Sequence, residues 1–487
     1  MKRLSLIASA ALVFAAEAKL EKIVDVTLAD QQGLVNFAAK TGSFINEPML
    51  AMLPAGLFVA TPLATQGFGP ARGDANFYAA VYADENVASM SLNEISEGDK
   101  FNFAILYPVT SSKAGFLAAN THAKEENGVI IWNEMSVIFS ADGKYAAVAS
   151  DADAAREALA GVAKIPALKK DEAVRFRVFN AAMQLTVKAL ESEEDLKMCP
   201  QVMDIYKSVT GVEFSLCAGD YGIDLRGSVG CTQGSLLSKL GNKPLSSGTP
   251  LEFAGKDALI ACAHAADAAG SDCDAQWKKL MTFAAKWGIK TDWVSYEKKG
   301  VGSKIVIDPV ALATYMKTEG KSEFEKNIEK IMEDVMALYT PLVEAKSPEQ
   351  ACAFYVKGAK VPVDAQTRFD KVLPGFSRKP CASVGVFSLY GIIKSVCEVV
   401  CPLIDAKDAK EAKAFLAQLP SADSSAIAYA WMKKGPLTHE YIVRVNPAEI
   451  RNFYVAIQML QAEIHRQTDA AAEAIVEAAF EAIENAD

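Results

Sequence analysis

The sequence predicts an α+β fold with duplicated antiparallel sheets and helices packed against them. Strand-like and helical patterns alternate along the whole 487-residue chain. In Tyr441–Leu460 a strand pattern leads directly into Asn446, Pro447 and a helical pattern. Asparagine is a favourable N-cap and proline suits the first helical position. The same order recurs in Lys304–Met316 around Asp308, which indicates that one structural unit is repeated.

Composition and charge narrow the classes of function. Hydrophobic residues make up 51% of the chain and charged residues 23%, which is usual for a soluble globular protein. The formal net charge of −10 disfavours nucleic acid and anionic membrane surfaces as partners, since both require a basic face. The length allows two to four domains with sizeable cores.

The N-terminal residues have the pattern of a secretory signal peptide. Lys2 and Arg3 precede the apolar run Leu4–Ala16, and residues 16–18 read Ala-Glu-Ala. We expect cleavage after Ala18, with residues 1–18 as the signal peptide. The alternative is an N-terminal core helix. No later stretch has the roughly 18 continuous apolar residues of a membrane span. A periplasmic or secreted location is therefore expected.

Residues 19–245 are expected to form an N-terminal α+β domain. Strands are predicted at 77–82, 101–107, 129–132, 136–140, 145–149, 174–178, 213–217 and 223–229. Asp142-Gly143 predicts a hairpin turn. Asp151 or Asp153 is expected to cap the helix that follows; a cation site is the alternative for this pair.

The stretch Gly241–Pro250 is rich in glycine, proline and serine, which favours a boundary there. Residues 246–487 then form a second α+β domain with an internal duplication at about 250–320 and 373–460, followed by a C-terminal helix. Each copy is expected to contain an apolar helix, at Leu259–Ala269 and Val384–Leu403. A hairpin follows, with the turns Lys298-Lys299-Gly300 and Lys433-Lys434-Gly435. Between the copies, the 3.6-residue period predicts a helix at Glu323–Leu342.

Cysteine usage suggests a disulfide in the second domain. The chain has nine cysteines, so at least one stays free or pairs between chains. On one straight helix Cys262 and Cys273 would lie about 16 Å apart, too far to bond. If Ala269-Gly270-Ser271 breaks that helix, the two can meet in a disulfide. The alternative is that these two thiols do not form a bridge.

No coherent catalytic or metal-binding set is recognisable in the sequence. The chain has four histidines, and it lacks the H-E-x-x-H, G-x-S-x-G and Walker patterns. Cys262 and His264 are two residues apart, so on a helix they would point away from each other. Asp308 and Asn446 are interpreted as helix caps. We therefore expect no catalytic residue, no metal site and no cofactor.

The stretch from Phe101 to Gly161 is similar to a pattern in secreted bacterial proteins of unknown function. The residues concerned are Phe103–Pro108, Asp142-Gly143-Lys144 and Val148-Ala149-Ser150-Asp151, together with the turn Leu53–Gly56. This resemblance covers about a third of the chain. It implies an exported α+β protein with ferredoxin-like sheets, and it supplies no site residues.

Three functions follow as hypotheses. The first is an exported, non-catalytic protein that binds another component of the envelope or of the extracellular space. The second is an exported hydrolase whose site is assembled from distant segments. The third is a periplasmic carrier of a small ligand, which requires a large apolar pocket.

Overall fold

A computed structural model describes residues 20–54, 62–84, 101–162, 167–192, 200–268, 273–315, 349–401 and 406–484. Within these ranges the protein is a mixed α+β structure with 12 α-helices and one large sheet of 17 strands. The predicted cleavage site at Ala18 and the predicted helix Glu323–Leu342 lie outside the described residues.

The strands are short to medium in length and are spread over the chain. They are β1 (Leu20–Leu28), β2 (Phe77–Asp84), β3 (Phe101–Pro108), β4 (Lys124–Glu126), β5 (Val129–Trp132), β6 (Met135–Phe139), β7 (Tyr145–Ala149), β8 (Glu172–Phe179), β9 (Val209–Gly219), β10 (Gly222–Cys231), β11 (Ile260–His264), β12 (Val294–Lys299), β13 (Gly302–Ile307), β14 (Gln350–Val356), β15 (Cys381–Phe387), β16 (Ile427–Gly435) and β17 (Thr438–Val445).

The helices lie between these strands in the chain. The α-helices are α2 (Gln31–Ile45), α5 (Lys113–Ala119), α6 (Ala152–Gly161), α7 (Asn180–Ser192), α9 (Pro200–Ser208), α10 (Leu236–Lys239), α11 (Cys273–Lys286), α12 (Pro309–Tyr315), α14 (Ala365–Val372), α15 (Leu389–Val400), α16 (Ala406–Gln418) and α17 (Pro447–Glu484). Short 3₁₀ turns are η1 (Pro48–Met52), η2 (Ala64–Gln66), η5 (Glu252–Ala254) and η7 (Phe376–Arg378).

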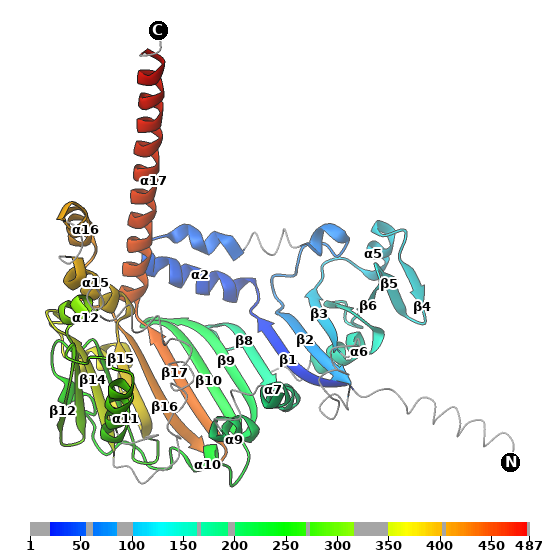
Figure 1. Ribbon diagram of the computed structural model, residues 1–487. Helices are drawn as coiled ribbons and strands as arrows, with labels where there is room; N and C mark the ends of the chain where they lie inside the picture. The colour runs from blue at the N-terminus through cyan, green and yellow to red at the C-terminus, as the bar shows by residue number, and fades with distance from the viewer. Residues whose placement is uncertain are drawn as a thin grey trace.

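The strand pairings join the two halves of the chain into one sheet. Its order is β4-β5-β6-β7-β3-β2-β1-β8-β9-β10-β17-β16-β15-β11-β14-β13-β12. All pairs are antiparallel except β13 with β14. The sheet curves strongly, and α17 projects away from it (Figure 1). Because β10 pairs with β17, the sheet continues across the predicted domain boundary at residue 245.

The cores lie at the two ends of the sheet and along its margins. On one face, α6 covers β3 and β7 around Leu106, while α14 covers β15 and β16 around Phe369. On the other face, α2 packs near one end of β8 to β10, and α7, α9 and α10 pack near the opposite end around Met183. The middles of β8, β9, β10 and β17 thus keep partly exposed side chains on both faces.

Several local predictions are confirmed by hydrogen bonds. The Asp151 carboxylate accepts from the Ala154 amide at 2.7 Å and caps α6. Asn446 accepts from the Glu449 amide at 2.8 Å and caps α17, and Asp308 accepts from the Ala311 amide at 3.1 Å and caps α12. Gly143 has a φ of 67°, as expected for the Asp142-Gly143 turn. All eight strands predicted between residues 77 and 229 are present.

Of the two apolar helices predicted in the second half, the one at Leu259–Ala269 is wrong and the one at Val384–Leu403 is confirmed in part. Residues 260–264 form strand β11. Residues 384–387 are the end of β15, and the helix α15 begins only at Leu389 and ends at Val400. β11 lies between β14 and β15, so both of its edges are paired. Short apolar runs are ambiguous by periodicity alone, because a strand buried on both faces has no alternation to read.

The two proposed copies share an order of elements but differ in strand pairing. Each has a strand, a helical segment, a hairpin and a further helix: β11-α11-β12-β13-α12 and β15-α15-α16-β16-β17-α17. However, β15 pairs with β16 directly, whereas β14 lies between β11 and β13.

Of the helices in the described ranges, none combines the length and apolar character of a membrane span.

Candidate functional site

Side chains on the central strands separate into a charged face and an apolar face. Directly opposed residues of antiparallel strands point to the same side, and successive residues alternate. One set of rows across β1, β8, β9, β10 and β17 contains Asp25, Arg177, Glu213, Ser228 and Glu440, and then Thr27, Arg175, Ser215, Arg226 and Ile442. We call this side the charged face.

The intervening rows form the opposite side, which we call the apolar face. One row contains Val26, Phe176, Phe214, Gly227 and Tyr441, and the next contains Leu28, Val174, Leu216, Leu225 and Val443. None of these ten residues carries a charged side chain. Two positions are clearly exposed although they are large and apolar: Leu225 at 47% and Phe214 at 37%.

The first ionic cluster on the charged face centres on Asp25, whose side chain is 1% exposed. Arg177 donates to both carboxylate oxygens, from Nε at 2.8 Å and from Nη2 at 2.6 Å. The Tyr78 hydroxyl donates to Oδ2 at 3.0 Å, and Lys22 lies 3.4 Å from the same oxygen. Burial and the nearby Asp25 charge raise the pKa of Tyr78, so its hydroxyl stays protonated.

The second cluster joins Glu172 to Arg175 and Ser215. Arg175 Nε donates to Glu172 Oε1 at 2.7 Å, and the Ser215 hydroxyl donates to the same oxygen. Burial acts to raise the pKa of Glu172, but the hydrogen bonds from Arg175, Ser215 and the Lys169 amide outweigh it and lower that pKa. Glu172 is therefore a stable carboxylate and a weak base.

The third cluster joins the two halves of the sheet. Arg444 on β17 donates from Nη2 to Asp224 Oδ2 on β10 at 2.7 Å. Arg226 donates to the same oxygen at 2.9 Å and to Asp171 at 2.7 Å. Burial acts to lower the pKa of Arg226, but the hydrogen bonds that Arg226 donates to Asp224 and Asp171 outweigh it and raise that pKa, so Arg226 remains charged.

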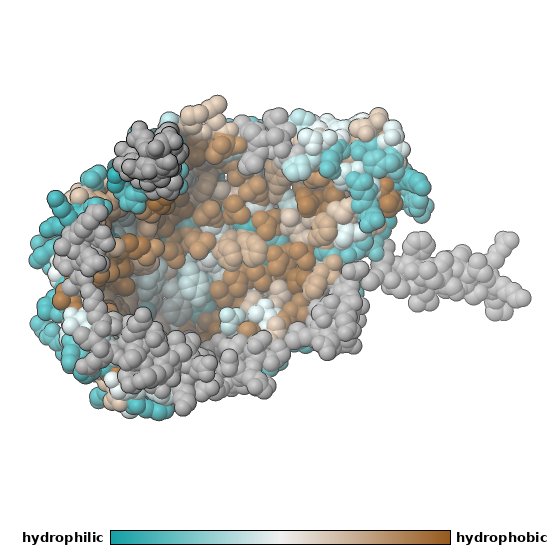
Figure 2. Space-filling view, turned by 45° about the horizontal axis from the view of Figure 1, so that its top comes forward, coloured by the Kyte–Doolittle hydropathy of each residue, from teal (hydrophilic) through white to brown (hydrophobic). Residues whose placement is uncertain are grey.

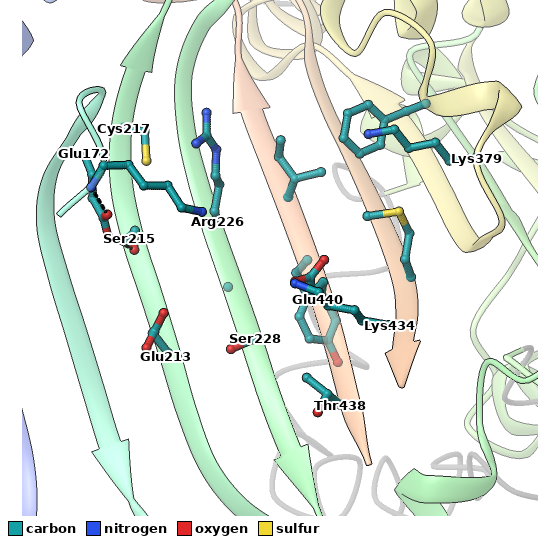
Figure 3. A pocket seen from close by; sticks show the side chains of 16 residues that line it. Glu172, Glu213, Ser215, Cys217, Arg226, Ser228, Lys379, Lys434, Thr438 and Glu440 are labelled. Carbon is teal, nitrogen blue, oxygen red and sulfur yellow. Dashed lines mark hydrogen bonds and ion pairs between the residues drawn. The ribbon is translucent and has the colours of Figure 1, made fainter. Parts of the chain in front are cut away.

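A cavity of about 440 Å³ opens on the charged face between these clusters and η7. Figure 3 shows Glu172, Ser215 and Arg226 projecting into it from β8, β9 and β10, with Glu440 on β17. Burial raises the pKa of the Cys217 thiol to about 11, so this thiol is neutral at pH 7. Within the cavity, Glu172, Arg226 and the Lys434–Glu440 pair already form ion pairs. Ser215 has a carboxylate partner of lowered pKa rather than a histidine.

The apolar face forms the floor of a hollow. Figure 2 shows a broad depression whose lining is largely hydrophobic. α2 stands at one end of the central strands and α7, α9 and α10 at the other. Lys40 on α2 forms an ion pair with Asp220 in the β9–β10 turn, which links the α2 wall to the floor. Large exposed apolar patches are typical of binding sites for partners or ligands.

The cysteines and histidines of interest are placed differently from expectation. Each cysteine in the described part of the chain is a free thiol, including Cys262 and Cys273, so their predicted disulfide stays a prediction. Because residues 260–264 form a strand, Cys262 and His264 point to the same face and not away from each other. His264 Nδ1 lies 2.8 Å from the Ser383 hydroxyl, and burial lowers the pKa of His264.

Within the described ranges no group of three or more potential ligands is arranged to bind a metal.

Sequence reasoning missed both faces. The alternation of Val174, Phe176 and Val178 with Arg175 and Arg177 was a signal that β8 has one apolar and one charged side. Which strands extend these two sides depends on pairings between distant segments, such as β1 with β8 and β10 with β17.

Comparisons with known proteins add little. No protein-family model matches this chain, and no curated protein matches it. A solved structure described as crystal form I of TP0453 is similar over 43% of this chain and 75% of that chain, at 11% sequence identity and a TM-score of 0.22.

Proposed function

We propose that this is a non-catalytic binding protein of the cell envelope or extracellular space, and that its apolar hollow holds an aliphatic chain such as a lipid acyl group. The single observation that carries the proposal is the pair of uncharged rows across five neighbouring strands, with Leu225 and Phe214 exposed at their centre. Export and the envelope location rest on the signal-like N-terminus.

The chemistry of the floor favours an aliphatic ligand. A surface without charged groups offers burial of apolar area rather than directional hydrogen bonds. Strands are spaced about 4.8 Å apart, so the rows from β1 to β17 extend for roughly 19 Å. Since one leaflet of a bilayer core is about 15 Å thick, an acyl chain fits along these rows.

The shape of the floor disfavours a second copy as occupant. The apolar face lies in a depression bounded by helices (Figures 1 and 2), and two concave faces cannot make close contact with each other. A slender ligand that enters between α2 at one end of the strands and α7 at the other would contact both uncharged rows of the apolar face. The hypothesis of a small-ligand carrier and that of a protein that binds an envelope component are then compatible. A lipid is both a small ligand and a component of the envelope.

The charged face supports the non-catalytic part of the proposal. A hydrolase needs a nucleophile beside a competent base. Ser215 donates to Glu172, whose pKa is lowered and which also accepts from Arg175 and the Lys169 amide. These groups brace β8 against β9 and leave no strong base for Ser215.

We also propose that the second half arose by duplication of ferredoxin-like units, on the basis of the shared strand-helix-hairpin-helix order.

The test is a titration of purified protein with a fluorescent long-chain fatty acid, followed by competition with unlabelled chains of decreasing length. We expect saturable binding whose affinity falls steadily as the chain shortens, by about 0.8 kcal/mol for each CH₂ lost from contact. Absence of saturable binding, or affinity that does not depend on chain length, would refute the proposal. Turnover of an ester of the same chain would instead favour the hydrolase.

A further inference from the structure

Three cysteines from separate segments converge between α11 and the sheet. Cys262 on β11 lies directly opposite Cys352 on β14. Cys273 is the first residue of α11, and its amide donates to the Gln350 side-chain oxygen at 3.1 Å. The Cys273 thiol lies 3.0 Å from the same oxygen. Gln350 thus holds the start of α11 beside β14, two residues from Cys352.

The three thiols have different partners. Cys352 is hydrogen-bonded to the Cys273 thiol, and this bond together with burial raises the pKa of Cys352. Cys262 instead directs its sulfur towards the Cys352 carbonyl oxygen at 3.7 Å and the Tyr429 hydroxyl. Burial raises the pKa of Cys262 to about 11. Cys352 thus has a hydrogen bond with the Cys273 thiol, whereas its interaction with the Cys262 thiol is electrostatic only.

A glycine keeps Cys262 in its separate place. Gly385 on β15 lies between Cys262 and Tyr429 in the row across β11, β15 and β16. A Cβ atom at residue 385 would lie 2.3 Å from the Tyr429 ring, so only glycine leaves room for the ring to cross β15. This arrangement brings the Tyr429 hydroxyl to Cys262 across β15.

We propose that Cys273 and Cys352 are a thiol-disulfide site, and that oxidation joins these two residues while Cys262 stays reduced. The co-reactant is a disulfide oxidant, such as oxidised glutathione. One protein thiolate attacks the oxidant and releases one thiol, which gives a mixed disulfide. The second protein thiolate then displaces the other thiol. The two protein thiols lose two protons and two electrons, and the oxidant becomes two thiols.

The bond would fasten α11 to an interior strand. Further along the helix, Asp274 forms an ion pair with Lys298, and Trp277 stacks on Tyr296 with ring centroids 5.0 Å apart. These contacts attach α11 to the β12–β13 hairpin at the edge of the sheet. A Cys273–Cys352 bond adds a covalent link to β14, whose two edges are both paired. The site is independent of the apolar hollow.

Peptide mapping distinguishes the possible pairings. The folded protein is incubated with oxidised glutathione, its remaining thiols are alkylated, and it is digested with trypsin without reduction. Trypsin releases residues 257–278, which contain Cys262 and Cys273, and residues 347–357, which contain Cys352. We expect these two peptides to be linked, with the alkyl group on Cys262. An internal bond within 257–278, a link through Cys262, or three alkylated thiols would overturn the proposal.

Variants control for misfolding. Cys262→Ser is expected to keep the link between the two peptides, and Cys352→Ser is expected to lose it while circular dichroism stays unchanged. Cys273→Ser, at the start of α11, provides a second variant that is expected to lose the link. If Cys352→Ser instead forms a Cys262–Cys273 bond as readily as the wild type forms its link, the thiols are exchangeable and the proposed selectivity is wrong.

Discussion

Phe176 on β8 and Phe214 on β9 lie directly opposite each other, with ring centroids 4.9 Å apart and ring planes 24° apart. Arg175 and Arg177 flank Phe176 on β8 and point to the opposite side of the sheet. Arg175 binds Glu172, and Arg177 binds Asp25. β8 therefore supplies one ring of a stacked aromatic pair to the apolar face and two ion-paired arginines to the charged face. Mutations on this strand should therefore separate the proposed ligand binding from the stability of the sheet.

Leu225→Lys is predicted to weaken binding of the fluorescent fatty acid at least tenfold. Leu225 is 47% exposed on the apolar face, so a lysine there is tolerated by the free protein. A bound chain would have to cover the ammonium group, which costs several kcal/mol unless the side chain turns away. Isothermal or fluorescence titration measures the change.

Val301→Lys is the matched control, because Val301 is 55% exposed in the turn between β12 and β13. Unchanged affinity is expected there. Equal losses in both variants would mean that added positive charge alone, and not the hollow, sets the affinity.

Asp25→Asn is predicted to lower the free energy of unfolding by about 3 kcal/mol. The substitution leaves Arg177 facing a neutral amide and removes an acceptor of the Tyr78 hydroxyl. Urea denaturation of the wild type and the variant measures the difference. Asp74→Asn breaks the exposed Arg72–Asp74 pair and should change the midpoint little. A small effect at Asp25 would show that the sheet tolerates an unpaired Arg177.

Glu449→Gln is predicted to change how stability depends on pH. The Glu449 side chain is fully buried, accepts from the Ser388 hydroxyl at 2.8 Å and the Tyr390 amide at 2.9 Å, and its pKa is raised by burial. The pKa of Glu449 is higher in the folded than in the unfolded chain. The protonated Glu449 carboxyl group therefore adds its full contribution to the free energy of unfolding below the unfolded pKa, about 4.3. It is lost as pH rises through the folded pKa.

The measurement is the urea midpoint of both proteins at a series of pH values from 4 upward, at which both remain folded. The wild type should lose stability relative to Glu449→Gln as pH rises. A constant difference across the series would mean that the Glu449 carboxyl group does not titrate differently in the folded and unfolded chains.

Gly385→Ala is predicted to destabilise the protein by about 1–3 kcal/mol, because the new methyl group overlaps the Tyr429 ring. The same change should disturb the contact between Tyr429 and Cys262. Gly435→Ala is the control: nothing lies within 4 Å of its Cβ position, so a neutral or slightly stabilising effect is expected. Thermal unfolding of the two variants compares them directly.

The sequence predicted the local structure better than the site. Caps at Asp151, Asp308 and Asn446 and the hairpin at Asp142-Gly143 could be read because a few neighbouring residues determine them. The strand at Cys262 was mistaken for a helix because Ile260–His264 contains small apolar residues without alternation.

The charged clusters could not be predicted for a different reason. Asp25 and Arg177 are 152 residues apart and Asp224 and Arg444 are 220 apart. Their contacts exist because β1 pairs with β8 and β10 with β17. Periodicity along one segment carries no information about which distant strand lies beside it.

The pairing of β10 with β17 has a consequence for proteolysis. Eight residue pairs, from Ile223 with Val445 to Gly230 with Thr438, form this ladder, and Arg444 crosses it to Asp224. A protease that nicks the chain in Gly241–Pro250 would cut the only peptide link between fragments 20–240 and 251–484, but the ladder would remain. The two fragments should therefore co-purify as a nicked complex. Expressed separately, each would present an unpaired strand edge and tend to aggregate, whereas co-expression should let them complement each other.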